Sequence, residues 1–270
     1  MYEDFYANIE DTGAFLRRIH LDPAEIKPDK ESLNKILYNH HRYVPFDNLD
    51  VWGRAIEPSL AVPDLFDKIV NRHRGGYCFE MNGHLEAELR TLGFECYSVQ
   101  IRITKGRDFL PPYRHRAVIT IIDGKKHFCD VGLGFIFFPE AAELDGGYTR
   151  FGYKAVRDGD LCKVIVKKPD GEEEIVRFYD EPMLPIDFIN PNIACSLDPK
   201  STFRTRLSMV IMTPEENRKN LVSDGPVHEA KTSVLTLKDP GGNLLEERTI
   251  DNKTQLSAVL REEFGVEFEI

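Results

Sequence analysis

Residues 74–80 read Arg-Gly-Gly-Tyr-Cys-Phe-Glu, so a single cysteine, Cys78, follows closely on two glycines. Apolar side chains then recur at helical spacing, and Gly93 is the expected end of this helix. The recurring side chains are Cys78, Met81, Leu85, Leu89 and Leu92. This pattern predicts that Cys78 lies in the first turn of a helix, on its buried side. There the positive end of the helix dipole favours the thiolate.

The chain before this helix has helical periodicity, and the chain after it has the pattern of strands. Upstream, helical spacing recurs at 33–40, and Pro63 opens a short helix. Downstream, a last helix is expected at 256–264. Between the two helices, apolar β-branched runs alternate with Asp-Gly or Gly-rich turns. These runs are 117–122, 127–131, 164–166, 175–176, 207–212 and 233–237. The order predicts an α+β fold of helices, an antiparallel sheet and a mixed α/β segment.

A hairpin after the cysteine helix decides whether His115 and Asp130 can act together. If Asp123-Gly124 is a two-residue loop, His115 and Asp130 are diagonal neighbours on one face of the ribbon. A four-residue loop would keep both on one face but farther apart. A three-residue loop would place them on opposite faces, because side chains alternate along a strand.

The face of the hairpin that carries His115 is apolar, so it must pack against another element. It also carries Ala117, Ile119, Ile121 and Phe128. We expect this face to dock on the apolar face of the cysteine helix and so to bring the imidazole to the thiol.

Taken singly, each of these residues has a structural interpretation. Cys78 fits an ordinary core position, His115 a hydrogen-bonded core group, and Asp130 a turn cap before Gly132. Taken together, a cysteine, a histidine and a carboxylate make an activated nucleophile. From the residues alone, both an acyl-transfer site and a hydrolase site remain open.

The bulk composition excludes several other classes of protein. The chain has 270 residues, 41% of them hydrophobic and 30% charged, with a net charge of −10. That charge argues against a nucleic-acid partner. No apolar run is long enough to cross a membrane, and the N-terminus lacks the layout of a signal peptide. The five scattered cysteines predict a reduced, cytoplasmic protein, and neither Cys-x-x-Cys nor His-x-x-x-His occurs, so no metal site is expected.

Four motifs together resemble the arylamine N-acetyltransferase family. The stretch at 74–80 resembles its active-site cysteine motif, and Pro-Phe-Asp-Asn-Leu at 45–49 is similar to its Pro-Phe-Glu-Asn-Leu segment. His115 before an apolar strand and Asp-Val-Gly-Leu-Gly at 130–134 match the histidine and aspartate motifs. Ser-Thr-Phe at 201–203 is similar to a later Ser-x-Phe segment. The resemblance covers nearly the whole chain in the right order.

The resemblance implies a three-part fold around a triad like that of cysteine proteases. A helical bundle (1–92) would carry the nucleophile Cys78. A β-barrel-like domain (93–190) would carry His115 and Asp130, and an α/β lid (191–270) would follow. It further implies ping-pong transfer of an acetyl group from acetyl-CoA, as co-substrate, to an arylamine or arylhydrazine.

The resemblance also implies further site residues. Phe46, Leu133 and Phe203 are expected to line the acceptor pocket, and Gly132 and Gly134 are candidates for close approach to coenzyme A. Two alternatives stay open: an amide synthase of the same fold that uses a larger acyl donor, and a non-catalytic binding protein.

The chain departs from the family pattern at three places. Asp47 stands where the family has a glutamate that pairs with the arginine of the cysteine motif, here Arg74, so this pair is expected to be weaker or rerouted. Leu133 stands where phenylalanine is frequent, which predicts a differently shaped pocket. Pro-Pro-Tyr at 111–113 is unusual beside the site.

Overall fold

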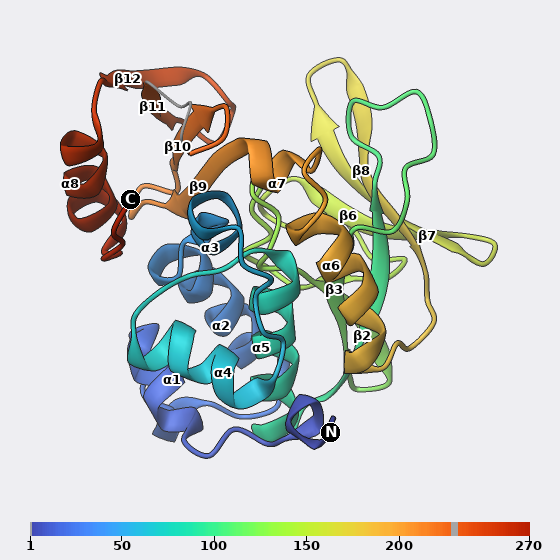
Figure 1. Cartoon of the computed structure of the whole chain (residues 1–270). Helices are drawn as coiled ribbons and strands as arrows, with labels where there is room; N and C mark the ends of the chain where they lie inside the picture. Colours follow the sequence, from blue (N-terminus) through green and yellow to red (C-terminus); the bar gives the residue numbers. More distant parts are fainter. Residues whose placement is uncertain (1, 228–231) are drawn as a thin grey trace.

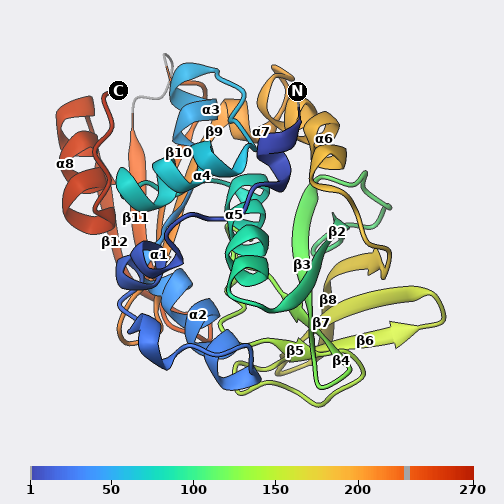
Figure 2. The same cartoon turned by 90° about the horizontal axis from the view of Figure 1, so that it is seen from below.

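The computed structural model describes residues 2–227 and 232–270. The N-terminal part is helical, as its periodicity predicts. Its α-helices are α1 (Thr12–Arg18), α2 (Lys30–Tyr43), α3 (Leu49–Arg54), α4 (Val62–Phe66) and α5 (Cys78–Thr91). A π-type turn at Asp67–Asn71 continues α4. Helix α5, the predicted cysteine helix, lies centrally in both views of the molecule (Figures 1 and 2).

An antiparallel sheet follows and curls into a nearly closed barrel. In the described chain its seven strands have the order β5-β4-β3-β2-β8-β7-β6. They are β2 (Glu95–Ile103), β3 (His115–Ile122), β4 (Lys125–Cys129), β5 (Ala142–Glu143), β6 (Tyr153–Asp158), β7 (Leu161–Lys168) and β8 (Gly171–Tyr179). A bridge between Leu144, just after β5, and Ala155 of β6 joins the two edges of the sheet.

The C-terminal part is a second sheet covered by a helix. Helices α6 (Ile189–Ser196) and α7 (Thr202–Thr205) lead into it. Among the described residues its order is β1-β9-β10-β11-β12, and α8 packs on one face (Figure 1). The elements are β1 (Phe46–Asp47), β9 (Arg206–Met212), β10 (Arg218–Asp224), β11 (Ser233–Lys238), β12 (Leu244–Ile250) and α8 (Lys253–Phe264).

The predicted α+β fold is therefore confirmed, with N-terminal helices, a nearly closed antiparallel barrel and a C-terminal sheet with a helix. The boundaries at residues 92 and 190 stay a prediction. Strand β1 comes from the N-terminal region but pairs with β9, so the first and last parts share a sheet. No helix within the described residues combines the length and apolarity that crossing a bilayer requires.

The hairpin has the predicted two-residue loop. Ile122 pairs with Lys125, and Val118 pairs with Cys129. Both loop residues have positive φ, 52° at Asp123 and 74° at Gly124, which suits the right-handed twist of the strands.

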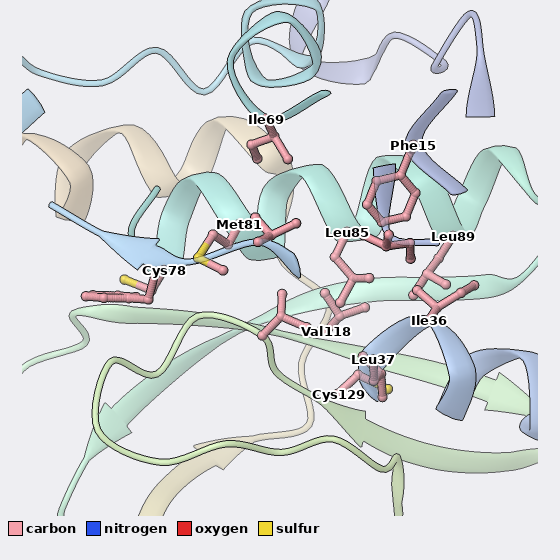
Figure 3. Close-up of a cluster of buried hydrophobic side chains, with 14 of the residues drawn as sticks. Phe15, Ile36, Leu37, Ile69, Cys78, Met81, Leu85, Leu89, Val118 and Cys129 are labelled. Carbon is pink, nitrogen blue, oxygen red and sulfur yellow. The ribbon is translucent and has the colours of Figure 1, made fainter. Parts of the chain in front are cut away.

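The predicted docking face of the hairpin, however, is wrong. Ala117, Ile119 and Phe128 point into the barrel interior, where they pack with residues of β2, β7 and β8. The opposite face meets α5: Val118 and Cys129 belong to one buried cluster with Met81, Leu85 and Leu89 (Figure 3). Both faces of the hairpin are buried and apolar, so alternation along the strand did not indicate which face meets the helix.

Candidate active site

The cysteine motif forms the tight entry to α5. Tyr77 caps the helix, and its N–H donates to Oε2 of Glu80 at 3.1 Å. The preceding loop is pressed against β1, because the N–H of Asp47 donates to the carbonyl of Gly76 at 2.9 Å. A Cβ atom on Gly75 would lie 1.7 Å from the carbonyl oxygen of Pro45, so only glycine fits there. Cys78 is the first residue of the helix.

A buried cluster of charged side chains anchors this loop. Arg74 lies 3.3 Å from Asp47 and 3.4 Å from Asp50, and Lys68 lies 2.6 Å from both Asp50 and Glu80. The pair expected between Arg74 and Asp47 is thus present, but Arg74 shares its charge with Asp50. Among the described residues, Oδ2 of Asp47 has no hydrogen-bond partner.

His115 and Asp130 form the contact that the hairpin geometry predicts. Nε2 of His115 lies 2.6 Å from Oδ2 of Asp130, and both residues are buried. The other oxygen of Asp130, Oδ1, accepts the N–H of Gly132 at 2.8 Å. Because Asp130 occupies Nε2, Nδ1 is the ring nitrogen left for another partner.

Asn82 ties the three segments of the site together, a role that the sequence analysis did not assign. Its Nδ2 donates to Oδ1 of Asp130 at 2.9 Å and to the carbonyl of Arg116 at 2.6 Å. Its Oδ1 accepts the N–H of Val131 at 3.0 Å. Asn82 lies four residues after Cys78, on the same face of α5, and this spacing is the signal that could have identified it.

His41 of α2 contacts the chain at Asp130 and at Phe138. Its Nε2 accepts the N–H of Phe138 at 3.2 Å, and its ring also meets the backbone of Asp130. Burial lowers the pKa of His41 to about 4, so the ring is neutral at physiological pH. His41 is therefore a structural group, and the sequence analysis gave it no catalytic part.

Cys78 and His115 open into one cavity of about 280 Å³. Burial raises the pKa of the Cys78 thiol well above its ordinary value, and negative charge on Cys195 and Asp130 acts in the same direction. Backbone N–H groups of Arg116 and Phe79 oppose this rise without reversing it. Burial therefore acts against the thiolate that the position at the helix start is expected to favour. A thiolate at Cys78 needs a counter-charge.

The predicted pocket residues Phe46, Leu133 and Phe203 all line this cavity. So do Gly132 and Gly134, the two candidates for close approach to coenzyme A. The two glycines also serve packing within the protein. A Cβ atom on Gly132 would lie 2.7 Å from Cα of Cys78, and one on Gly134 would lie 2.6 Å from the ring of Phe46. Their contact with a cofactor stays a prediction.

Several lining residues were not predicted, and four of them come from β9 and β10. The polar ones among the unpredicted residues are Arg114, Thr202, Arg206, Ser208 and Asn220. The sequence around β10 carries no turn or alternation signal that would place it over the site. Within residues 2–227 and 232–270, no three His, Cys, Asp or Glu side chains are placed to hold a metal ion.

Comparisons with known proteins agree with this arrangement. A profile of the N-acetyltransferase family matches residues 29–270. An arylamine N-acetyltransferase from Mycolicibacterium smegmatis is 32% identical over 78% of this chain and 79% of its own length. The structure of the arylamine N-acetyltransferase from Salmonella typhimurium superposes with a TM-score of 0.84 at 25% identity, covering 96% of this chain and 92% of that one.

A further solved structure shares the fold and holds coenzyme A. The Mycobacterium marinum arylamine N-acetyltransferase in complex with CoA superposes with a TM-score of 0.80 at 22% identity, covering 95% of this chain and 93% of that one. The fold and these matches together define the chain as an acyltransferase. It belongs to the arylamine N-acetyltransferase family.

Proposed function

We propose that this protein transfers an acetyl group from acetyl-CoA to the nitrogen of an arylamine or arylhydrazine through an acetyl-Cys78 intermediate. The observation that carries the proposal is the opening of Cys78 and His115 into one cavity while Asp130 occupies the far nitrogen of the ring. Membership in the family supports the choice of acyl donor and acceptor.

In the first half-reaction, Nδ1 of His115 takes the thiol proton, and the sulfur of Cys78 attacks the thioester carbonyl. The bond to the sulfur of CoA breaks, and the leaving thiolate takes the proton back from the imidazolium. Because burial raises the pKa of the isolated thiol, the imidazolium supplies the counter-charge that a thiolate needs here. Asp130 holds the ring in the tautomer with Nε2–H and stabilises its positive charge.

In the second half-reaction, the amine nitrogen attacks the acetyl-cysteine, and His115 removes its proton. The S–C bond to Cys78 breaks, and the product is an amide or hydrazide. The apolar walls Phe46, Leu133 and Phe203 support transfer over hydrolysis, because they favour an aromatic ring over water beside the acyl group.

The size of the cavity bears on the alternative of a larger acyl donor. A volume of about 280 Å³ lies at the small end of ligand pockets, and it suits an acetyl group and one aromatic ring. We therefore favour acetyl transfer over an amide synthase. Cytoplasmic location stays a prediction that rests on the five free thiols.

Mass spectrometry of the intact protein tests the proposal. Mixing with acetyl-CoA alone should add one acetyl group to Cys78, and an arylamine such as an aminosalicylate should remove it. The Cys78→Ala variant is the control and should stay unmodified. A panel of acyl-CoAs that loads a long chain faster than acetyl would favour the amide synthase instead.

Alkylation of Cys78 separates an enzyme from a non-catalytic binding protein. We expect iodoacetamide to label Cys78 rapidly near neutral pH, and the His115→Ala variant to label only as the pH rises, because burial raises the pKa of an unpaired thiol. Equal labelling rates in both proteins would contradict the thiolate–imidazolium pair.

A further inference from the structure

The nucleophile and its base come from different elements, so their separation depends on how β3 lies on α5. Cys78 begins α5, and His115 begins β3. The strand ladder holds His115 within the sheet, and the hydrogen bonds of the helix hold Cys78 within α5, but neither holds the one against the other. Side chains that cross from the sheet to the helix therefore decide whether the imidazole reaches the sulfur.

Arg116, the residue after His115, makes such a crossing. Its Nη2 donates to Oε2 of Glu86 on α5 at 2.6 Å, and its Nε donates to the hydroxyl of Ser98 on β2 at 2.7 Å. The hydroxyl of Ser98 in turn donates to the same oxygen of Glu86. All three residues are buried. They form a closed network that joins β2, β3 and α5.

The surface of α5 has a slot for the guanidinium of Arg116. A Cβ atom on Gly83 would lie 2.8 Å from Nη1 of Arg116, so the missing side chain leaves the room that the guanidinium occupies. The ring of Phe188 lies against the same group, with its centroid 4.4 Å from Cζ. A planar group that is held by a fork of hydrogen bonds and packed on a ring has little freedom to shift along the helix.

The main chain of Arg116 also meets α5, closer to the nucleophile. Its carbonyl accepts Nδ2 of Asn82 at 2.6 Å. Its N–H is one of the two backbone groups that oppose the rise in the pKa of Cys78 that burial causes. One residue of β3 thus meets the helix at Cys78, at Asn82 and at Glu86, which lie on successive turns of α5.

We propose that Arg116 is a positioning residue, whose side chain, held by Glu86 and Ser98, sets the approach of β3 to α5 and so keeps His115 at the sulfur of Cys78. This inference rests on the proposed acetyl transfer and adds a residue to it. Among the described residues, His115 lines the catalytic cavity and Arg116 does not, so Arg116 acts through its neighbour and not on the substrate.

A buried ion pair has a simpler interpretation, in which it contributes to stability alone, and a double substitution separates the two. Arg116→Met leaves Glu86 without its buried partner, so the folded state should lose stability. Arg116→Met combined with Glu86→Met removes both charges, and apolar replacement of a buried pair is often neutral for stability. The double variant should therefore recover most of the denaturant midpoint that the single variant loses.

The positioning role predicts that the double variant regains stability but not reactivity. We expect its turnover with acetyl-CoA and an aminosalicylate to stay below wild type by on the order of 10²-fold, because small displacements of reacting groups are costly. Iodoacetamide should label Cys78 only as the pH rises, as in His115→Ala, because burial raises the pKa of a thiol that lacks its counter-charge.

Two further variants complete the test. Arg116→Lys keeps the buried charge but lacks the planar fork that spans Glu86 and Ser98, so its turnover and pH profile should lie between those of wild type and the double variant. Arg90→Met is the matched control. Arg90 lies 3.7 Å from the same carboxylate, but its side chain is one-third exposed and it lies near the end of α5 away from Cys78. Its loss should leave the pH profile of Cys78 unchanged.

Two results would overturn this inference. Wild-type turnover in the double variant would limit the pair to stability. A wild-type alkylation profile in the double variant, or in Arg116→Lys if the double variant does not fold, would show that His115 stays in place without the fork. Alkylation needs no acetyl transfer. If wild-type protein never forms acetyl-Cys78, the proposed function fails, and the alkylation profiles still decide the role of Arg116.

Discussion

The orientation of one imidazole ring depends on a small set of hydrogen bonds. Asp130 accepts from His115, from Asn82 and from the N–H of Gly132. A carboxylate fixed by three donors cannot turn away from the ring without leaving buried groups unpaired. The sequence predicted the contact between His115 and Asp130 from strand alternation. It did not predict the role of Asn82, because a side chain that bridges three segments has no local pattern.

Replacing the charge of Asp130 tests the role of the ring's tautomer. Asp130→Asn keeps the shape of the side chain but removes the acceptor that favours Nε2–H on His115. We expect turnover to fall by about 10³–10⁴-fold, as in other sites where the aspartate of a triad is neutralised. Steady-state kinetics measures it. Near-normal turnover would remove Asp130 from the mechanism.

Truncating Asn82 tests the bridge between α5, β3 and the turn after β4. Asn82→Ala leaves Oδ1 of Asp130 and the N–H of Val131 each without one partner, which costs on the order of 1–3 kcal/mol of unfolding free energy. Denaturant unfolding measures this loss. If Asn82 also positions the ring, the pH at which Cys78 becomes reactive should rise. An unchanged pH profile would limit Asn82 to stability.

At the scale of elements, the site is the junction of a helix start with the end of a hairpin. Strand pairing ends at Val118 and Cys129, so Asp130 and Gly132 lie just past the ladder and run over the first turn of α5. The turn and register of the hairpin were predictable because they depend on neighbouring residues. The face that meets α5 was not, because helix and barrel bury opposite faces of the same strands.

The close approach of Gly132 to the nucleophile gives a prediction at this scale. A Cβ atom in Gly132→Ala would lie 2.7 Å from Cα of Cys78, a backbone contact that no side-chain rotation relieves. We expect a loss of activity of at least about tenfold, because small displacements of reacting groups are costly. Gly147→Ala is the control, since a Cβ there meets no atom within 4 Å. Equal kinetics in both variants would contradict the proposed strain.

At the scale of the whole molecule, α5 is buried on all sides, including its acidic residues. Glu88 is fully buried, and neither of its carboxyl oxygens has a hydrogen-bond partner in the part of the chain that the structure describes. Burial raises the pKa of Glu88 to about 9 and lowers that of His84, 3.5 Å away, to about 3. Both groups are therefore uncharged at neutral pH, and their contact is not an ion pair.

These two pKa shifts predict how stability depends on pH. The folded state holds the proton of Glu88 between about pH 4.5 and 9, where the unfolded state releases it, so stability falls as the pH rises through this window. His84 acts in the opposite sense, and stability rises between about pH 3 and 6.5. Together they predict a decline on the alkaline side above pH 6.5.

Glu88→Gln should remove that alkaline decline. The amide needs no proton to stay neutral, so the variant should be more stable than wild type at pH 8, by on the order of 4 kcal/mol, and little changed at pH 5. Thermal and denaturant unfolding at both pH values measure the effect. The exposed Glu262→Gln is the control and should not alter the slope. Parallel curves for Glu88→Gln and wild type would contradict a protonated Glu88.

The sequence by itself determined the elements and the candidate triad. The helix from Cys78, its end before Gly93 and the two-residue hairpin loop follow from capping, spacing and turn chemistry, all of which act between near neighbours in the chain. The four motifs then indicated the family, and the family profile matches residues 29–270.

Only the tertiary structure decided what surrounds the nucleophile. It showed that burial raises the pKa of Cys78, that Asn82 links three segments, and that Arg114 and Arg206 give the cavity its charge. These properties depend on desolvation and on contacts between segments that lie far apart in the chain. Packing of the whole molecule creates both, and no local pattern of residues encodes either.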